Sequence, residues 1–132
     1  MKSHARVVVI GGGVVGISTL YHLAKKGWKD VVLVERKELT SGSTWHAAGL
    51  LPLFNMSYSV GQIHKYSVQC YQELEKETGM NVGFRNVSNI RLASNQDRMD
   101  EYRQYAGVAS TIGVEVDFLT PEQVLDYWPM CN

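Results

Sequence analysis

The chain has 132 residues, with 13 basic and 13 acidic side chains and a hydrophobic fraction of 45%. This composition is typical of a soluble globular domain or of a piece of one. The balanced charge gives no reason to expect nucleic acid or an anionic membrane as a partner, and no apolar stretch is long enough to cross a bilayer.

The first predicted elements are a strand, a glycine turn and the start of a helix. Residues 7–10 are an unbroken run of β-branched side chains, which predicts a strand of a parallel sheet that is covered on both faces. Gly11, Gly13 and Gly16 follow in the G-x-G-x-x-G spacing. Gly11 permits a tight turn, Gly13 lets a pyrophosphate approach the backbone, and Gly16 lets the helix pack close to the strand. The helix then presents free N–H groups and its positive dipole end to the phosphates.

The residues after this motif fit a dinucleotide-binding βαβ unit. Apolar residues at helical spacing lead to Gly27, which ends the expected helix, and residues 30–34 read as the second parallel strand. Glu35 follows, where a dinucleotide fold places an acid that accepts hydrogen bonds from the adenosine ribose. The alternative, a βαβ unit that binds no ligand, is disfavoured by this combination.

Residues 35–53 are rich in small and hydroxylated side chains and contain Trp45 and His46. Such a composition lets backbone and hydroxyl groups press closely on a polar ligand, as phosphate-binding loops do. The alternative is an ordinary surface connection, although loops of this length in compact domains are usually functional.

A long helix is predicted next, from Ser57 or Ser59 to Thr78, with Gly79 as its left-handed stop. His64 lies beside its apolar stripe and is interpreted as a packed or solvated side chain. The stripe consists of Val60, Ile63, Ser67, Cys70, Tyr71 and Leu74. The pattern between Val82 and Ala93 predicts two short strands.

The last third of the chain predicts two helices and one strand. A capping box from Ser94 to Asp97 opens a helix that ends at Gly113. Residues 114–119 alternate like a strand, and Thr120 caps a further helix that ends at Trp128-Pro129. The first helix should pack through one face, formed by Met99, Tyr102, Ala106 and Ala109.

Cys70 and Cys131 stand far apart, without a metal-ligand pattern around them. We therefore expect reduced thiols and no metal site, as in a cytoplasmic enzyme. A mitochondrial matrix location is the alternative, after removal of a transit peptide.

Two segments resemble a known family. Residues 7–36 look like the dinucleotide-binding signature of flavoproteins, which many FAD and NAD proteins share. Residues 40–50 contain the run Ser-Gly-Ser-Thr-Trp-His-Ala-Ala-Gly-Leu, of which residues 43–49 are far more specific. They resemble the second FAD loop of the dimethylglycine dehydrogenase and sarcosine dehydrogenase family, which belongs to the D-amino-acid-oxidase-like FAD enzymes. The resemblance covers nearly the whole chain and implies an α/β fold, with a Rossmann-like FAD-binding core and additional strands and helices.

The resemblance also implies a set of cofactor-binding residues. Val14 and Val15 would place their backbone against the pyrophosphate, Glu35 would hold the ribose, and Arg36 would lie near the adenine. Residues 42–50 would wrap the pyrophosphate, the ribityl chain and the flavin edge. The full set is Gly11, Gly13, Val14, Val15, Gly16, Glu35, Arg36, Gly42, Ser43, Thr44, Trp45, His46, Ala47, Ala48, Gly49 and Leu50.

His46 matches the histidine that this family bonds covalently to the 8α-methyl carbon of the flavin. A neutral imidazole nitrogen is a good nucleophile near neutral pH, and the bond would raise the flavin potential. The alternative is a histidine that only hydrogen-bonds the cofactor. No residue of the chain is assigned as a catalytic acid or base.

The implied activity is oxidation of a small amine, such as dimethylglycine or sarcosine, by hydride transfer from its N-methyl carbon to the flavin. Oxygen or an electron-acceptor protein would take up the electrons, and tetrahydrofolate is a further cofactor expected of the longer protein. A two-domain flavoenzyme needs well over about 200 residues, so we expect residues 1–132 to be the N-terminal part of an FAD-binding domain, without most of the substrate domain. The alternatives are an NAD-dependent dehydrogenase, which the first βαβ unit alone allows, and an isolated cofactor-binding fragment without activity.

Overall fold

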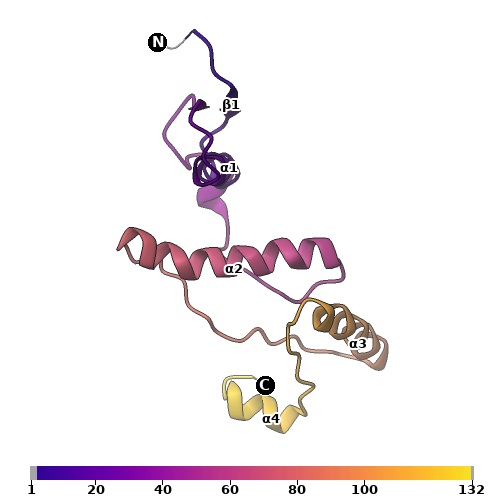
Figure 1. Cartoon of the computed structure of the whole chain (residues 1–132). Coiled ribbons are helices and arrows are strands. Elements are labelled where there is room, and N and C mark those ends of the chain that lie inside the picture. The colour runs from indigo at the N-terminus through magenta and orange to yellow at the C-terminus, as the bar shows by residue number, and fades with distance from the viewer. Residues whose placement is uncertain (1–2, 132) are drawn as a thin grey trace. The chain divides into compact units, whose positions relative to one another are not determined.

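The structure, a computed structural model, describes residues 3–131. Met1, Lys2 and Asn132, the ends of the expected domain range, lie outside the described residues. The chain divides into two compact units, with the boundary between Leu50 and Leu51 (Figure 1).

The first unit is a βαβ arrangement. Strand β1 (Val7–Ile10) is followed by helix α1 (Val14–Lys25) and strand β2 (Val31–Val34). The strands are parallel, and Val7 pairs with Val31 at one end of the ladder. A short 3-10 helix, η1 (Ser43–His46), lies in the segment after β2. The predicted strand–helix–strand order is confirmed.

The end of α1 confirms the stop predicted at Gly27. This glycine has φ +84°, and its N–H donates to the Ala24 carbonyl oxygen at 2.9 Å. The next N–H, of Trp28, donates to the Leu23 carbonyl oxygen at 3.0 Å. These two bonds form a Schellman motif, which satisfies carbonyl groups at the helix end and turns the chain toward β2.

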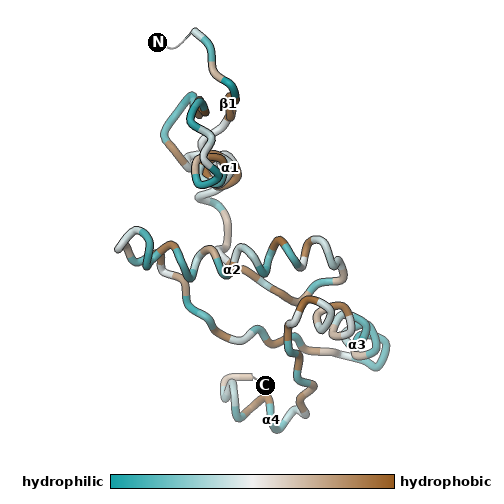
Figure 2. Tube along the Cα trace, viewed as in Figure 1, coloured by the Kyte–Doolittle hydropathy of each residue, from teal (hydrophilic) through white to brown (hydrophobic). Residues whose placement is uncertain are grey.

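The prediction that both faces of β1 are covered is wrong. Val7 and Val9 are half-buried, whereas Val8 is 52% exposed and Ile10 is 86% exposed. The reason is that α1 packs on the sheet from one side, and the described residues of this unit supply no layer for the other side. Figure 2 shows β1 as a strongly hydrophobic segment, so the uncovered side is apolar.

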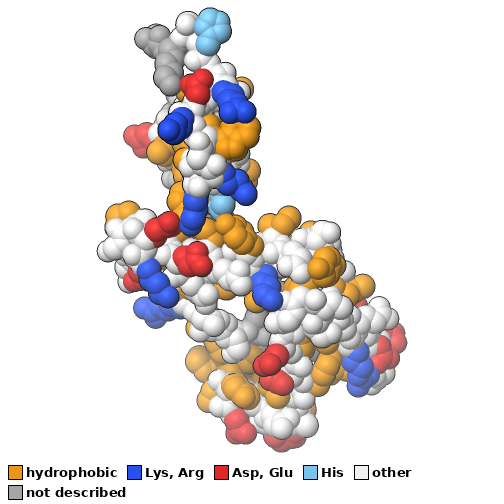
Figure 3. Space-filling view, in the orientation of Figure 1, with side chains coloured by type: hydrophobic (Ala, Val, Ile, Leu, Met, Phe, Trp, Pro, Cys, Tyr) orange, Lys and Arg blue, Asp and Glu red, His pale blue; other side chains and the backbone are white. Residues whose placement is uncertain are grey.

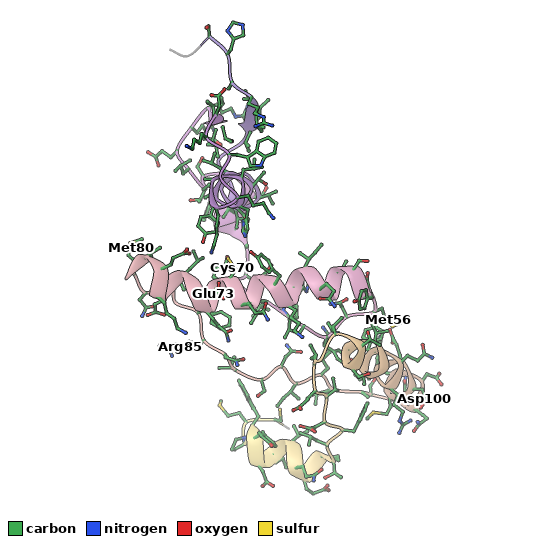
Figure 4. All side chains as sticks on the ribbon, viewed as in Figure 1. Met56, Cys70, Glu73, Met80, Arg85 and Asp100 are labelled. Atoms are coloured by element: carbon green, nitrogen blue, oxygen red, sulfur yellow. The ribbon has the colours of Figure 1, made fainter. Side chains whose placement is uncertain are left out.

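The second unit is built from helices. Helix α2 (Tyr58–Thr78) begins after Ser57, whose Oγ accepts from the Val60 N–H at 3.3 Å, and ends at Gly79 with φ +69°. Both predicted ends of this helix are confirmed. Its mixed hydropathy along the chain is that of an amphipathic helix (Figure 2), and Figure 4 places the half-buried Cys70 on it.

Helix α2 packs against helix α3 (Gln96–Thr111). The predicted stripe is confirmed in part, since Ser67, Cys70, Tyr71 and Leu74 are half-buried. The buried position on α2 is Gly61, where a Cβ would lie 2.6 Å from the Ile112 side chain. Val60 and Ile63, at the start of the predicted stripe, are 42% and 64% exposed. Periodicity alone missed this because the close approach of the two helices requires a glycine, which carries no apolar signal.

The cap of α3 is one residue later than predicted. The N-cap is Asn95, whose Oδ1 accepts from the Arg98 N–H at 2.9 Å, so the predicted capping box opened by Ser94 is wrong. Asn and Ser cap helices about equally well, and the sequence offers both side by side. At the other end, Gly113 has φ +72° and ends the helix as predicted. The predicted inner face is confirmed, with Ala109 fully buried.

Helix α4 (Pro121–Tyr127) confirms the predicted capping box. The Gln123 N–H donates to Thr120 Oγ1 at 3.3 Å, and the Thr120 N–H donates to Gln123 Oε1 at 2.9 Å. The helix ends before the Trp128-Pro129 pair, as expected from the proline.

The strands predicted between Val82 and Ala93 and over residues 114–119 are not formed. Among residues 3–131, β1 and β2 are the strands that the structure contains. The side-chain patterns favour extended chain at both segments. A strand also needs a neighbour that exchanges backbone hydrogen bonds, and these segments do not pair with each other.

Candidate functional site

The glycine turn lies at the carboxyl end of the two-stranded sheet. The Gly11 N–H donates to the Val34 carbonyl oxygen at 2.9 Å, and Gly11 has φ +106°, which favours glycine. A Cβ on Gly16 would lie 1.9 Å from the Gly11 carbonyl oxygen. The first turn of α1 therefore lies directly on the glycine turn, as the roles predicted for Gly11 and Gly16 require.

Glu35 is bound to this turn by its own side chain. One carboxylate oxygen accepts from the Gly12 N–H at 2.6 Å, and the other accepts from the Lys37 N–H at 2.8 Å. These bonds, the one from Gly12 foremost, hold the pKa of the Glu35 carboxyl below its ordinary value of 4.5. The site therefore presents an ionised acceptor at the end of β2 at neutral pH.

Gly12 also belongs to the candidate site. The sequence pattern did not predict it, because it occupies a variable position of the motif. It is buried, and a Cβ there would lie 2.6 Å from the Leu39 side chain and 3.1 Å from the Glu35 Cβ. Its carbonyl oxygen also accepts from the Thr40 N–H at 2.9 Å. Thr40 itself has φ +65°, which is uncommon for a threonine. The signal that could have found Gly12 is the run of three consecutive glycines.

The segment after β2 meets the N-terminus of α1 through Thr44. Thr44 Oγ1 accepts from the Val14 N–H at 2.9 Å, and a Cβ on Gly13 would lie 3.0 Å from the same oxygen. The structure thus brings together the two predicted parts of the site, the glycine turn and the serine-rich segment. The two segments lie so close together that a side chain on Gly13 would press against the Thr44 hydroxyl.

His46 lies at the end of η1, with one ring nitrogen engaged. Its Nδ1 is 3.1 Å from the Gly42 carbonyl oxygen. Because a carbonyl oxygen only accepts, Nδ1 carries the hydrogen in this contact, and the lone pair of the neutral ring is at Nε2. The Trp45 ring lies 4.0 Å from the imidazole, centroid to centroid, at an interplanar angle of 37°, and Trp45 is 68% exposed.

The remaining predicted site residues are exposed and less defined. Val14 and Val15 form the first turn of α1, with solvent-exposed side chains. The other exposed residues are Arg36, Gly42, Ser43, Ala47, Ala48, Gly49 and Leu50.

The residues at the N-terminus of α1 fit an anionic dinucleotide. Gly13 is the N-cap and supplies no side-chain cap, and the first turn of the helix contains no acidic residue. Backbone N–H groups and the helix dipole there favour a phosphate. Glu35, ionised at the neighbouring strand end, supplies the acceptor that ribose hydroxyls need.

Other classes of site find less support in the described part of the chain. Across residues 3–131 no group of three or more His, Cys, Asp or Glu side chains could hold a metal ion. No helix over the same residues has the length and apolar character needed to span a membrane. An open hollow in the second unit is lined by Ala106, Ser110, Gly113 and residues 114–117, which include none of the predicted site residues.

Comparison with known families gives a match over nearly the whole chain. The family described as DAO, FAD dependent oxidoreductase, matches residues 6–132. The chain is 45% identical to human dimethylglycine dehydrogenase, mitochondrial, over 131 residues, which are 99% of the chain and 15% of that protein. It is 41% identical to human sarcosine dehydrogenase, mitochondrial, over 133 residues, which cover all of the chain and 14% of that protein.

A solved structure shows the same fold. L-proline dehydrogenase from P. horikoshii aligns over 98% of this chain and 34% of its own, with a TM-score of 0.81 and 22% identity. This neighbour supports the Rossmann-like part of the predicted fold class. The chain spans about 15% of the length of the dehydrogenases that it matches in sequence.

Proposed function

Because the chain belongs to the DAO family of FAD dependent oxidoreductases, we propose that it forms the FAD-binding part of an enzyme that oxidises the N-methyl carbon of a secondary or tertiary amine. Dimethylglycine and sarcosine are the substrates that its relatives' names suggest. The observation that carries the proposal is the contact between the glycine turn and residues 43–46 at the N-terminus of α1. The family description favours FAD over the NAD alternative.

The residues of the first unit have distinct roles in this proposal. The N–H groups of Val15 and Gly16 bind the pyrophosphate, since the first turn of a helix leaves such groups without intrahelical partners. The backbone of Val14 lies beside it, with its N–H held by Thr44 Oγ1. Glu35 accepts from the ribose hydroxyls while its bond to Gly12 fixes its position. Arg36 lies near the adenine, and residues 42–50 cover the pyrophosphate, the ribityl chain and the flavin edge.

The cofactor, when bound, supplies a two-electron acceptor for the hydride of the substrate. The contribution of this chain is to bind and orient it. The exposed face of η1, with Trp45 and His46, is the part of the segment available to the flavin end. No acid or base of these residues is assigned to the chemical step.

We further propose that His46 bonds through Nε2 to the 8α-methyl carbon of the flavin. The bond would replace a C–H bond of that methyl group, and the methyl carbon and the imidazole would each lose a proton. The two electrons would pass through the flavin ring to the electron acceptor of the enzyme, oxygen or an acceptor protein. The hydrogen bond from Nδ1 to the Gly42 carbonyl oxygen supports this, because it leaves the lone pair at Nε2. The Trp45 ring lies beside the imidazole at an interplanar angle of 37°. The alternative, a non-covalent contact, gives a different result in the experiment below.

The wider context of the enzyme is also a proposal. A small amine is the substrate, oxygen or an electron-acceptor protein takes up the electrons, and tetrahydrofolate serves the longer protein. The relatives are named as mitochondrial proteins, which favours the mitochondrial matrix over the cytoplasm.

The test is to purify the full protein that carries this chain and record its absorbance before and after denaturation. Flavin absorbance in the native protein supports the FAD assignment, and its absence contradicts it. Flavin that remains on the denatured polypeptide supports attachment at His46, whereas flavin released into the supernatant rejects attachment and leaves the FAD assignment intact. Turnover of dimethylglycine or sarcosine then tests the substrate class.

Two variants locate the attachment. His46→Ala should bind FAD but lose it on denaturation. The matched control is His64→Ala, which removes a histidine whose Nδ1 lies 2.7 Å from the Pro52 carbonyl oxygen in the second unit. This control should keep the flavin on the polypeptide.

A further inference from the structure

Thr44 connects the two parts of the candidate site. Its Oγ1 is the acceptor for the Val14 N–H at 2.9 Å, and residues 14 and 44 are thirty positions apart in the chain. Thr44 is also half-buried, unlike its neighbours Ser43, Trp45 and His46. The contact is therefore a long-range anchor of η1 on α1.

The same oxygen explains the glycine at position 13. A Cβ there would lie 3.0 Å from Thr44 Oγ1, tighter than an ordinary carbon–oxygen contact. The lack of a side chain at Gly13 thus admits the threonine hydroxyl as well as a ligand. Gly13 supplies no side-chain cap, and Thr44 from the other segment instead satisfies the N–H of Val14, the first helical residue.

The hydroxyl leaves the helix N-terminus able to bind an anion. A hydroxyl has one hydrogen to donate and two lone pairs to accept with. While Thr44 accepts from Val14, its own hydrogen remains available to an anionic oxygen at the same place. Thr44 therefore occupies the Val14 N–H but offers its own hydrogen to a phosphate in exchange, and the next N–H groups of the first turn have no intrahelical partner.

We propose that Thr44 is a positioning residue that fixes η1, and with it His46, at the phosphate-binding end of α1 before the cofactor arrives. The inference rests on the proposed function, since it assigns this preorganisation to FAD. Without the hydroxyl, η1 is no longer held on α1, and binding must order the segment at a cost in affinity. The loss of one such hydrogen bond corresponds to about 2- to 12-fold.

The test uses Thr44→Val and Thr44→Ser in the full protein carrying His46→Ala, because a covalently attached flavin would permit neither a cofactor-free protein nor a measured affinity. Valine keeps the branched shape without the hydroxyl, and serine keeps the hydroxyl. The matched control is Thr19→Val, which removes a hydroxyl that donates to the Val15 carbonyl oxygen further along α1 at 2.8 Å. Hydrogen–deuterium exchange of residues 13–17 and 42–47 is measured without cofactor, and FAD affinity is measured by quenching of flavin fluorescence.

We expect Thr44→Val to exchange faster in both segments and to bind FAD about 2- to 12-fold more weakly, with Thr44→Ser restoring both properties and Thr19→Val changing neither. Unchanged exchange in Thr44→Val overturns the inference, and so does faster exchange with equal or tighter FAD binding. If the wild-type protein binds no FAD, the proposed function fails and the assignment of the anchor to FAD fails with it. Exchange measured without cofactor then still reports separately whether Thr44 holds η1.

Discussion

Gly16 has no room for a side chain. A Cβ at this position would lie 1.9 Å from the Gly11 carbonyl oxygen, which is backbone and cannot rotate away. Gly16→Ala must therefore separate α1 from the turn, at a cost of about 3 kcal/mol or more. We expect loss of FAD binding and faster hydrogen exchange throughout α1.

Gly107→Ala is the matched control for this substitution. Its Cβ would meet no heavy atom within 4 Å, and Gly107 lies inside α3. Alanine should stabilise that helix by about 0.5–1 kcal/mol, because glycine loses more backbone entropy on folding. A Gly16→Ala protein that binds FAD as tightly as wild type would contradict the packing described for the turn.

The ionisation of Glu35 makes the first unit sensitive to acid. Hydrogen bonds from Gly12, and then from Lys37, lower the pKa of this carboxyl from its ordinary 4.5 in the folded state. A group whose folded pKa is depressed contributes stability that is complete above the unfolded pKa and is lost as the pH falls through the folded pKa. We therefore expect the melting temperature of wild type to fall below about pH 4.5 more steeply than that of Glu35→Gln.

Glu38→Gln serves as the comparison, since it removes a charge from the same segment without touching the Gly12 contact. Its melting temperature should follow that of wild type across the acid range. Equal acid sensitivity in wild type and Glu35→Gln would show that the carboxylate bonds to Gly12 and Lys37 contribute nothing in solution.

At the scale of the elements, two neighbouring residues, Ser94 and Asn95, could each be the N-cap of α3. Asn95 Oδ1 accepts from the Arg98 N–H, whereas the sequence pattern pointed to Ser94. Asn95→Ala should destabilise the second unit by about 1 kcal/mol, or about 4–8 °C in melting temperature. Ser94→Ala should remain within about 0.5 kcal/mol of wild type. If Ser94→Ala lowered the melting temperature more than Asn95→Ala, Ser94 and not Asn95 would be the N-cap.

The elements that were predicted correctly are those whose signals are local. Gly27, Gly79 and Gly113 end helices because each takes a positive φ, and Thr120 caps α4 with a bond to a residue three positions away. The elements that were missed depend on distant parts of the chain. Residues 82–93 have the side chains of a strand but not the neighbouring strand, and no local pattern reports whether one is present.

The candidate site likewise contains residues that local sequence patterns predict and contacts that such patterns do not report. The spacing of Gly11, Gly13 and Gly16 predicts the turn because its main demands are local: Gly11 takes a positive φ, and Gly16 passes close to the Gly11 carbonyl oxygen. The contact between Thr44 and Val14 spans thirty positions, so its geometry could come only from the structure. The role of Gly12 was not predicted because its burial depends on Leu39 and Glu35, which contact it from the segment after β2.

At the scale of the whole molecule, apolar surface remains uncovered in both units (Figure 3). Ile10 and Val8 face outward from the sheet of the first unit, and Ile63 faces outward from α2 in the second. Ala109 and Ile112 are the apolar residues that the structure buries most fully within residues 3–131, and both belong to the second unit. The first unit thus has little core of its own to stabilise it.

A unit with so small a core should depend strongly on its ligand. A ligand that binds only the folded form stabilises it by about 2.7 kcal/mol at a free concentration of 100 times its Kd. Every predicted cofactor-binding residue lies before Leu51, so FAD should slow hydrogen exchange in residues 11–16 and 35–46 far more than in α3, on which Figure 4 marks Asp100. Adenosine monophosphate is the control, because it lacks the pyrophosphate and should protect the first turn of α1 less. If FAD slowed exchange equally in both units, the first unit alone would not hold the cofactor. If FAD left exchange in residues 11–16 unchanged, the glycine turn would not belong to the site.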